Sequence, residues 1–168
     1  MSFSFSSQST KEKVFDAIEK HLATQGLGIS DSDPTRPWGG FFVIEEKDAD
    51  KFISIYFPDQ DISRDKKLSP KILIVAPNKR LSWQYHHRRA ELWKLVGGLA
   101  GVVRSDDDHE KETIHLKKGE TIQLEQGERH RLIGLDEWGV VAEIWQHTDK
   151  ERPSDENDIV RLQDDFGR

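Results

Sequence analysis

The sequence predicts an all-β domain of antiparallel strands, a barrel or jelly roll, that follows a short N-terminal α-helix. Two patterns indicate this fold class. After residue 40, eight short runs rich in β-branched and aromatic residues are separated by turn residues. Ahead of them, one segment repeats its apolar residues with helical spacing. A length of 168 residues suits a single domain. We expect residues 1–35 to hold the helix and a linker, and residues 36–168 to form the β domain.

The helix is expected over residues 11–23. Ser9 or Thr10 could cap its start, and a glycine follows its end. Its apolar face would consist of four residues: Val14, Phe15, Ile18 and Leu22. Residues 1–9 are expected to form a frayed, Ser-rich leader. The segment 28–37, with its Gly, Ser, Asp and Pro residues, is expected to be a linker.

Eight strands are expected in the β domain. Each run concentrates apolar residues over four to eight positions, and turn residues such as Gly97–Gly98 lie between the runs. The predicted strands cover residues 41–45, 52–57, 71–76, 91–96, 99–103, 112–116, 121–124 and 138–145. Strands this short and closely spaced are typical of an antiparallel barrel or jelly roll.

Composition excludes several classes of protein. The chain has no cysteine, which rules out disulfides, thiolate metal sites and a cysteine nucleophile. No run approaches the roughly 20 apolar residues of a membrane span. The first residues lack the basic and apolar regions of a secretory signal. We therefore expect a soluble cytoplasmic protein with no membrane partner.

The net charge of −6 is unevenly distributed. Residues 105–112 carry five acids and one lysine, and residues 149–168 carry seven acids and four bases. Residues 77–94, in contrast, carry five bases and one acid. The acidic total argues against nucleic-acid binding, whereas the basic segment could attract a small anion. A solvated basic strand edge is the alternative interpretation of that segment.

Four candidate metal ligands lie in or beyond this basic segment. On an extended strand Gln84 and His86 share a face, and a short turn would bring in Glu91 from the next strand. A second hairpin bounded by glycines would deliver His130. Two imidazoles, a carboxylate and an amide oxygen could surround one divalent cation and leave positions open for water or substrate. Either histidine alone would more often be structural or solvated, but the joint pattern favours a metal site because its spacing matches a known template.

This spacing resembles the two motifs of the cupin barrel, a double-stranded β-helix. The first motif, G-x5-H-x-H-x3-4-E-x6-G, aligns with Asn78, Gln84, His86, Glu91 and Gly98. The second, G-x5-P-x-G-x2-H-x3-N, aligns with Gly119, Glu125, Gly127, His130 and Gly134. Four positions depart from the motifs: Asn78, Gln84, Glu125 and Gly134 replace Gly, His, Pro and Asn. Asn tolerates the positive φ that the opening glycine of the first motif would adopt.

Within the cupins, the sequence is similar to the type II phosphomannose isomerase (mannose-6-phosphate isomerase) family. This family forms the cupin part of bifunctional isomerase/mannose-1-phosphate guanylyltransferase enzymes. The matching segments are RPWG (36–39), LSWQYHHRRAELW (81–93), GERHRL (127–132), AEIWQ (142–146), DIVR (158–161) and DFGR (165–168). Gln84 is normal in this family. Residues 1–30 lie outside the resemblance, and the segment between Glu46 and Lys71 is longer than expected.

The resemblance implies a metal-dependent aldose–ketose isomerase that interconverts mannose 6-phosphate and fructose 6-phosphate in carbohydrate metabolism, including polysaccharide biosynthesis. One divalent metal on Gln84, His86, Glu91 and His130 would polarise the sugar carbonyl. Zn is the first expectation, with Mn, Fe, Co and Ni as alternatives. The chain contains no G-x-G-x-R-L loop, so guanylyltransferase activity is not expected.

Further residues are assigned to catalysis and substrate binding. The predicted phosphate ligands are Arg36, Arg88 and Arg89, because guanidinium groups match phosphate bidentately. The predicted catalytic residues are Glu143 and Arg168. Glu143 alternates with Val141 and Trp145, so it could face the barrel interior, where burial would raise its pKa. A structural pairing of Glu143 with an arginine is the alternative.

Three other expectations concern packing. His87 would lie on the strand face opposite His86, at the surface or behind the metal ligands. Trp83, Trp93 and Trp145 are expected in the core. The apolar residues of the C-terminal segment, namely Ile159, Val160, Leu162 and Phe166, predict that this segment docks against the barrel.

Two other function classes stay open. One is a non-catalytic cupin that binds a sugar phosphate or nucleotide sugar, and the other is a metal cupin with oxygenase chemistry. Oxygenase sites commonly use more histidines, and such a function would leave the basic segment unexplained. Besides a phosphorylated hexose, the partners considered are a second copy of the chain and a separate guanylyltransferase.

Overall fold

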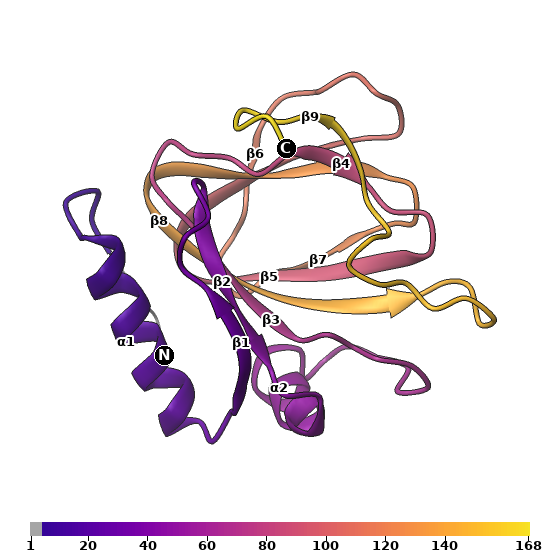
Figure 1. Ribbon diagram of the computed structural model, residues 1–168, viewed down its shortest axis with the longest axis horizontal. Helices are drawn as coiled ribbons and strands as arrows, with labels where there is room; N and C mark the ends of the chain where they lie inside the picture. Colours follow the sequence, from indigo (N-terminus) through magenta and orange to yellow (C-terminus); the bar gives the residue numbers. More distant parts are fainter. Residues whose placement is uncertain (1–4) are drawn as a thin grey trace.

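The protein is a β-barrel with a helical N-terminus, and the computed structural model describes residues 5–168 (Figure 1). Residues 1–4, the start of the expected leader, lie outside the described residues. The described strands are β1 (Ile29–Asp33), β2 (Gly39–Ile44), β3 (Lys71–Val75), β4 (Trp83–Tyr85), β5 (Arg89–Ser105), β6 (Ile114–His115), β7 (Thr121–Leu124), β8 (Arg129–His147) and β9 (Val160–Gln163). The helices are α1 (Lys11–Thr24), the 3-10 helix η1 (Glu46–Asp48) and α2 (Ala49–Tyr56).

The strands are antiparallel and follow the order β1-β2-β3-β8-β4-β9, while β5 pairs with β6, β7 and β8. In Figure 1 the strands enclose a barrel, with α1 and α2 outside it next to β1, β2 and β3. The predicted class, an all-β cupin-type jelly roll with a short N-terminal helix, is confirmed. No helix among residues 5–168 is long and apolar enough to cross a membrane.

Two long strands, β5 and β8, pair with each other along the wall of the barrel. β5 has 17 residues, β8 has 19, and they pair from Arg89↔His147 to Ser105↔Arg129. The prediction of two strands separated by a turn at Gly97–Gly98 is therefore wrong. The register shifts around these glycines, so the strand bends without ending. Gly98 has a φ of 65°, and a Cβ there would lie 1.8 Å from the carbonyl oxygen of Trp138.

The strand predicted at residues 52–57 is also wrong, because this segment is helix α2. Its buried residues, Ala49, Phe52, Ile53 and Tyr56, have the spacing of one helical face. The run FISIYF satisfies an alternating pattern as well, so periodicity over six residues does not separate strand from helix. The helix lies in the segment that is longer than expected and takes up eight of its residues, and its apolar face packs into the core shared with α1.

The N-terminal expectations are confirmed for the helix and corrected on either side of it. α1 covers residues 11–24, and the side chain of Thr10 accepts a hydrogen bond from the backbone N–H of Lys13 at 3.2 Å. The leader is not frayed over residues 5–9, since the indole Nε1 of Trp138 donates to the carbonyl oxygen of Ser9 at 3.1 Å. The expected linker contains strand β1, which pairs with β2.

A second, smaller hydrophobic core contributes to the barrel interior. Its buried members are Leu73, Val75, Trp93, Leu95, Ala100, Val102, Leu124, Leu132 and Val141. Three of them, Leu73, Trp93 and Leu132, also line a pocket in the barrel. Apolar packing therefore fills one part of the barrel and leaves polar side chains around the rest.

The C-terminal segment docks as predicted. β9 pairs with β4 in the register Gln84↔Arg161 and Tyr85↔Val160. The segment also carries an ion pair, in which Nε and Nη2 of Arg80 donate to the two carboxylate oxygens of Asp165 at 2.6 and 2.9 Å. This bidentate contact holds the end of the chain against the loop before β4.

We expect Asp165→Asn to destabilise the fold at pH 7 but not near pH 2. The hydrogen bond from Arg80 lowers the pKa of Asp165 to about 2. A lowered carboxyl pKa contributes stability that is present above the unfolded pKa of about 4 and is lost as the pH falls through the folded value. Because the Arg80 side chain is 40% exposed, we expect a loss of only about 1 kcal/mol at pH 7. Urea unfolding of both proteins across this range is the measurement, and a pH-independent difference would contradict the assignment.

Candidate functional site

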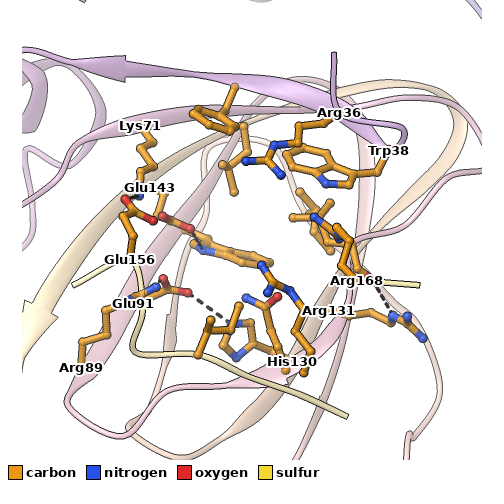
Figure 2. A pocket seen from close by; sticks show the side chains of 18 residues that line it. Arg36, Trp38, Lys71, Arg89, Glu91, His130, Arg131, Glu143, Glu156 and Arg168 are labelled. Carbon is orange, nitrogen blue, oxygen red and sulfur yellow. Dashed lines mark hydrogen bonds and ion pairs between the residues drawn. The ribbon is translucent and has the colours of Figure 1, made fainter. Parts of the chain in front are cut away.

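A pocket in the barrel brings together most of the predicted site residues (Figure 2). Its lining includes Gln84, Glu91 and His130, the predicted metal ligands other than His86. Glu91 and Glu143 lie on one side of the view in Figure 2, and Arg36 and Arg168 lie on the other. The glutamates thus share one side of the pocket with Lys71 and Arg89, and Arg36 and Arg168 make the opposite end cationic.

Three predicted ligands form a buried cluster. His86 follows β4, Glu91 lies on β5, and His130 lies on β8. The Nε2 atoms of His86 and His130 lie 3.6 and 3.2 Å from Oε1 of Glu91. One donor atom from each of the three residues falls within 4.8 Å of the others. Each residue is only 2% exposed, so the cluster is withdrawn from bulk solvent.

Backbone carbonyls fix the orientation of both imidazoles. Nδ1 of His86 lies 2.7 Å from the carbonyl oxygen of Asp158, and Nδ1 of His130 lies 2.9 Å from that of Glu128. Because a carbonyl can only accept, each Nδ1 carries a proton, and in the neutral ring each Nε2 therefore presents a lone pair to the cluster. Contacts of this kind orient histidines that bind metals.

The donor atoms fit a divalent cation. Oε1 of Glu91 and Nε2 of His130 are buried, and neither makes a hydrogen bond with any described residue, although they lie 3.2 Å apart. Burial opposes the ionisation of Glu91, yet the facing charges of His86 and Arg89 hold the pKa of its carboxyl well below the ordinary value. Burial lowers the pKa of His86. A carboxylate and neutral imidazoles are the forms that bind metals.

Gln84, the predicted fourth ligand, lies beside the cluster on β4. Its amide nitrogen is 3.5 Å from Nε2 of His86, and its amide oxygen accepts a hydrogen bond from the hydroxyl of Ser82 at 2.5 Å. A half-turn of the amide would exchange the two atoms and direct the oxygen toward the cluster, where the Ser82 hydroxyl could accept from the nitrogen. Ligation by Gln84 requires that rotation and stays a prediction.

Arg89 contacts the metal-ligand cluster instead of lying free in the pocket. Its Nε donates to Oε2 of Glu91 at 3.1 Å, and its Nη1 donates to Ser154 and to the carbonyl of Asp155 at 2.9 and 3.0 Å. Its guanidinium lies 3.9 Å from the ring centroid of Trp145. These contacts fix the second oxygen of Glu91 and connect it to the C-terminal segment.

Glu143 faces the pocket, as its alternation with Val141 and Trp145 predicts. Trp93 Nε1 donates to its Oε2 at 2.9 Å, and its Oε1 makes no hydrogen bond with residues 5–168. Burial, assisted by the charge of Glu91, raises the pKa of Glu143 to about 7. A group with this pKa can both take and return a proton near neutral pH.

The remaining predicted residues lie in different places. Arg36 and Arg168 line the pocket, whereas Arg88 lines a separate surface hollow together with His87. His87 is exposed. The three tryptophans predicted in the core, Trp83, Trp93 and Trp145, are all buried.

Four charged lining residues were not predicted from the sequence: Lys71, Arg131, Glu156 and Arg161. Lys71 Nζ donates to Oε1 of Glu156 at 2.7 Å and lies 4.3 Å from the ring centroid of Trp145. Lys71 alternates with Leu73 on β3, a pattern that could have placed it inside. Glu156 and Arg161 reach the pocket only because the C-terminal segment docks, and the sequence does not specify that register.

An antiparallel barrel that holds two imidazoles and a carboxylate around one point defines a cupin-type protein with a candidate metal centre. Residues 56–164 match the family described as mannose-6-phosphate isomerase, C-terminal. The chain therefore belongs to that family, as its sequence motifs predict.

Curated relatives agree with this assignment. The chain is 31% identical over 136 residues to a mannose-1-phosphate guanylyltransferase of Escherichia coli, covering 79% of the chain and 22% of that protein. It is 27% identical over 162 residues to the alginate biosynthesis protein AlgA of Pseudomonas aeruginosa, covering 94% and 28%. It is 29% identical over 134 residues to the xanthan biosynthesis protein XanB of Xanthomonas campestris, covering 79% and 23%. The chain thus spans about a quarter of the length of these relatives.

Solved structures agree on the fold. The capsular polysaccharide assembling protein CapF of Staphylococcus aureus matches with a TM-score of 0.53 and 16% identity, over 79% of this chain and 34% of that one. The polyketide cyclase RemF of Streptomyces resistomycificus matches with a TM-score of 0.53 and 15% identity, over 79% and 80%. At these identities the matches support the barrel and say nothing about chemistry.

Proposed function

We propose that the chain is a metal-dependent aldose–ketose isomerase that interconverts mannose 6-phosphate and fructose 6-phosphate. One observation carries this proposal: the His86–Glu91–His130 cluster and the buried carboxyl of Glu143 occupy the same barrel interior. Isomerisation of a hexose phosphate needs a carbonyl-polarising group and a base that moves a proton between adjacent carbons. The family match and the names of the relatives favour a mannose phosphate as substrate.

His86, Glu91 and His130 would hold the metal, with Gln84 as the predicted fourth ligand. A divalent cation, when bound, supplies a Lewis acid that polarises the sugar carbonyl. Zn suits a set of two histidines and a carboxylate, and Mn, Fe, Co and Ni remain alternatives. Arg89 would hold Glu91 in its binding orientation through the 3.1 Å hydrogen bond to Oε2.

Glu143 would move the proton. In the open-chain sugar it takes the proton from C2, the electrons of that C–H bond form the C1–C2 double bond, and O1 gains a proton. Glu143 then returns a proton to C1, while O2 releases its proton to solvent and becomes the ketone oxygen, which balances the proton that O1 takes from solvent. Trp93 holds Oε2 of Glu143, which leaves Oε1 for this transfer. The predicted roles of Arg168 in catalysis and of Arg36 in phosphate binding remain parts of this proposal. Arg88 lines a separate hollow and Arg89 contacts Glu91, so phosphate binding by these two residues stays a prediction outside it.

A coupled assay with chelator-treated protein tests the function. We expect conversion of mannose 6-phosphate to fructose 6-phosphate after addition of Zn²⁺ or another of the divalent ions above, and none before it. Tight binding of mannose 6-phosphate without turnover under any of these ions would favour the second candidate, a non-catalytic sugar-phosphate binding protein. A separate guanylyltransferase is a compatible partner for either function, because a relative that carries that name is several times longer than this chain.

A further inference from the structure

Three arginines from distant parts of the chain line the cationic end of the pocket. Arg36 lies in the loop between β1 and β2, Arg161 lies on β9, and Arg168 ends the chain. Figure 2 shows Arg36 and Arg168 on the same side of the pocket, away from Glu143 and Glu91. Docking of the C-terminal segment creates this group, since it supplies two of its three members.

Two of these arginines have a carboxylate partner, and the third has none. Nε of Arg36 lies 3.0 Å from Oδ2 of Asp33, and Nε of Arg168 lies 2.7 Å from Oδ2 of Asp164. The side chain of Arg161 makes no hydrogen bond or ion pair with any of residues 5–168. The group therefore presents one guanidinium whose five donors are free to bind an anion.

The surroundings of Arg161 favour an added negative charge. Partial burial and the nearby charges of Arg168 and Arg36 lower the pKa of Arg161, while Asp164 acts in the opposite direction. The positive charges of Arg161, Arg168 and Arg36 repel one another, and a bound anion would reduce that repulsion. The Nε atom of Arg36 is also buried without a well-oriented hydrogen bond to any described residue.

The register of the sheet sets the distance from this group to the metal-ligand cluster. His130 on β8 pairs with Gln84 on β4, and Gln84 pairs with Arg161 on β9. Directly paired residues project to the same face of a sheet. Arg161 is therefore two strand spacings, roughly 10 Å at the backbone, from a metal ligand on the pocket face. An extended six-carbon sugar with a terminal phosphate can bridge such a separation.

We propose that Arg161, together with Arg36 and Arg168, binds the phosphate of the substrate. The cluster of His86, Glu91 and His130 then faces the carbonyl end of the sugar. This inference rests on the proposed function for the sugar, but recognition of the phosphate needs neither metal nor turnover. It assigns the phosphate to a different place from Arg88, which lines another hollow, and from Arg89, whose donors are occupied by Glu91 and the C-terminal segment.

Calorimetric titration of the full chain, freed of metal, tests the proposal. We expect mannose 6-phosphate to bind and mannose to bind far more weakly, with inorganic phosphate competing. Arg161→Gln should weaken mannose 6-phosphate binding roughly 10–100-fold, because it removes charge-assisted hydrogen bonds. Arg161→Lys should recover part of the affinity, since it keeps the charge but loses the bidentate geometry. Arg64→Gln is the matched control, because Arg64 is half-exposed and paired with Asp50 outside the pocket.

The possible outcomes separate this inference from the proposed function. If Arg161→Gln binds mannose 6-phosphate as the wild type does, or if only Arg88→Gln weakens binding, the proposed phosphate site is wrong. If the wild type shows no preference for mannose 6-phosphate over mannose, the site is wrong as well. If binding depends on Arg161 but no metal produces turnover, the phosphate site stands and the isomerase function fails. Thermal unfolding of each variant establishes that it is folded.

Discussion

Glu143→Gln is expected to reduce the turnover of mannose 6-phosphate by about 10²–10⁴-fold, with little change in its affinity. Glutamine keeps the shape of the side chain and can still accept the hydrogen bond from Trp93, which is 2.9 Å long in the wild type. It cannot take a proton from C2. Steady-state kinetics of the metal-loaded protein and calorimetric binding of mannose 6-phosphate measure the two quantities separately.

A surface substitution provides the control for this comparison. Glu120→Gln makes the same chemical change at an exposed turn residue and should leave turnover unaltered. Turnover near the wild-type value in Glu143→Gln would remove Glu143 from the proton transfer. A loss confined to affinity would instead assign it to substrate binding.

His86→Ala is expected to abolish both metal binding and isomerisation. The change removes one of three converging donors, and the remaining pair of Glu91 and His130 could not hold a cation with comparable affinity. It also leaves the carbonyl of Asp158 without its 2.7 Å contact, which we expect to cost about 1–3 kcal/mol of folding stability. The measurement is the metal bound per chain after chelation, reloading and dialysis.

Two further observations distinguish lost ligation from lost folding. A bound metal should raise the unfolding temperature of the wild type, since it binds only the folded chain, and this increment should vanish in His86→Ala. The exposed neighbour His87 provides the matched variant, and His87→Ala should keep both the metal and the increment. One tightly held ion per chain in His86→Ala would contradict the assigned site.

Sequence patterns predicted correctly the elements whose apolar residues repeat with an unambiguous spacing. α1 is 14 residues long and repeats its apolar residues from Val14 to Leu22 with helical spacing, a pattern that an alternating strand does not produce. The run 52–57 is too short to separate the two periods, and its helix forms because Phe52, Ile53 and Tyr56 pack against the core beside α1. The Gly97–Gly98 pair resembles a turn locally, but long-range pairing of β5 with β8 carries the strand through it.

The site likewise contains residues that local patterns predict and residues whose place depends on long-range strand pairing. The spacing of His86, Glu91 and His130 on alternating strand positions, together with its match to the cupin motifs, predicted that they lie together. The Asn at position 78 does adopt a positive φ, of 59°, as expected for a residue that replaces the motif glycine. Arg161 was not found, because its place in the pocket depends on the register between β4 and β9, which no local pattern encodes.

Gly134 also has a structural reason to depart from the cupin motif. A Cβ at this position would lie 2.0 Å from the carbonyl oxygen of Ala76 and 2.8 Å from that of Lys79. The backbone of the turn before β4 packs directly on β8 here, so the asparagine of the motif would not fit without moving that turn. The departure therefore reflects close packing of two backbones and takes no donor from the metal-ligand cluster.

Proton NMR of mannose 6-phosphate in D₂O with the metal-loaded wild-type chain is the decisive test of isomerisation, because it observes the sugar and its C2 proton together. We expect fructose 6-phosphate resonances to appear and the C2–H signal of mannose 6-phosphate to decay, and we expect neither after chelation. A C2–H signal that persists unchanged while mannose 6-phosphate is bound, with every divalent ion tested, would contradict the proposed isomerisation.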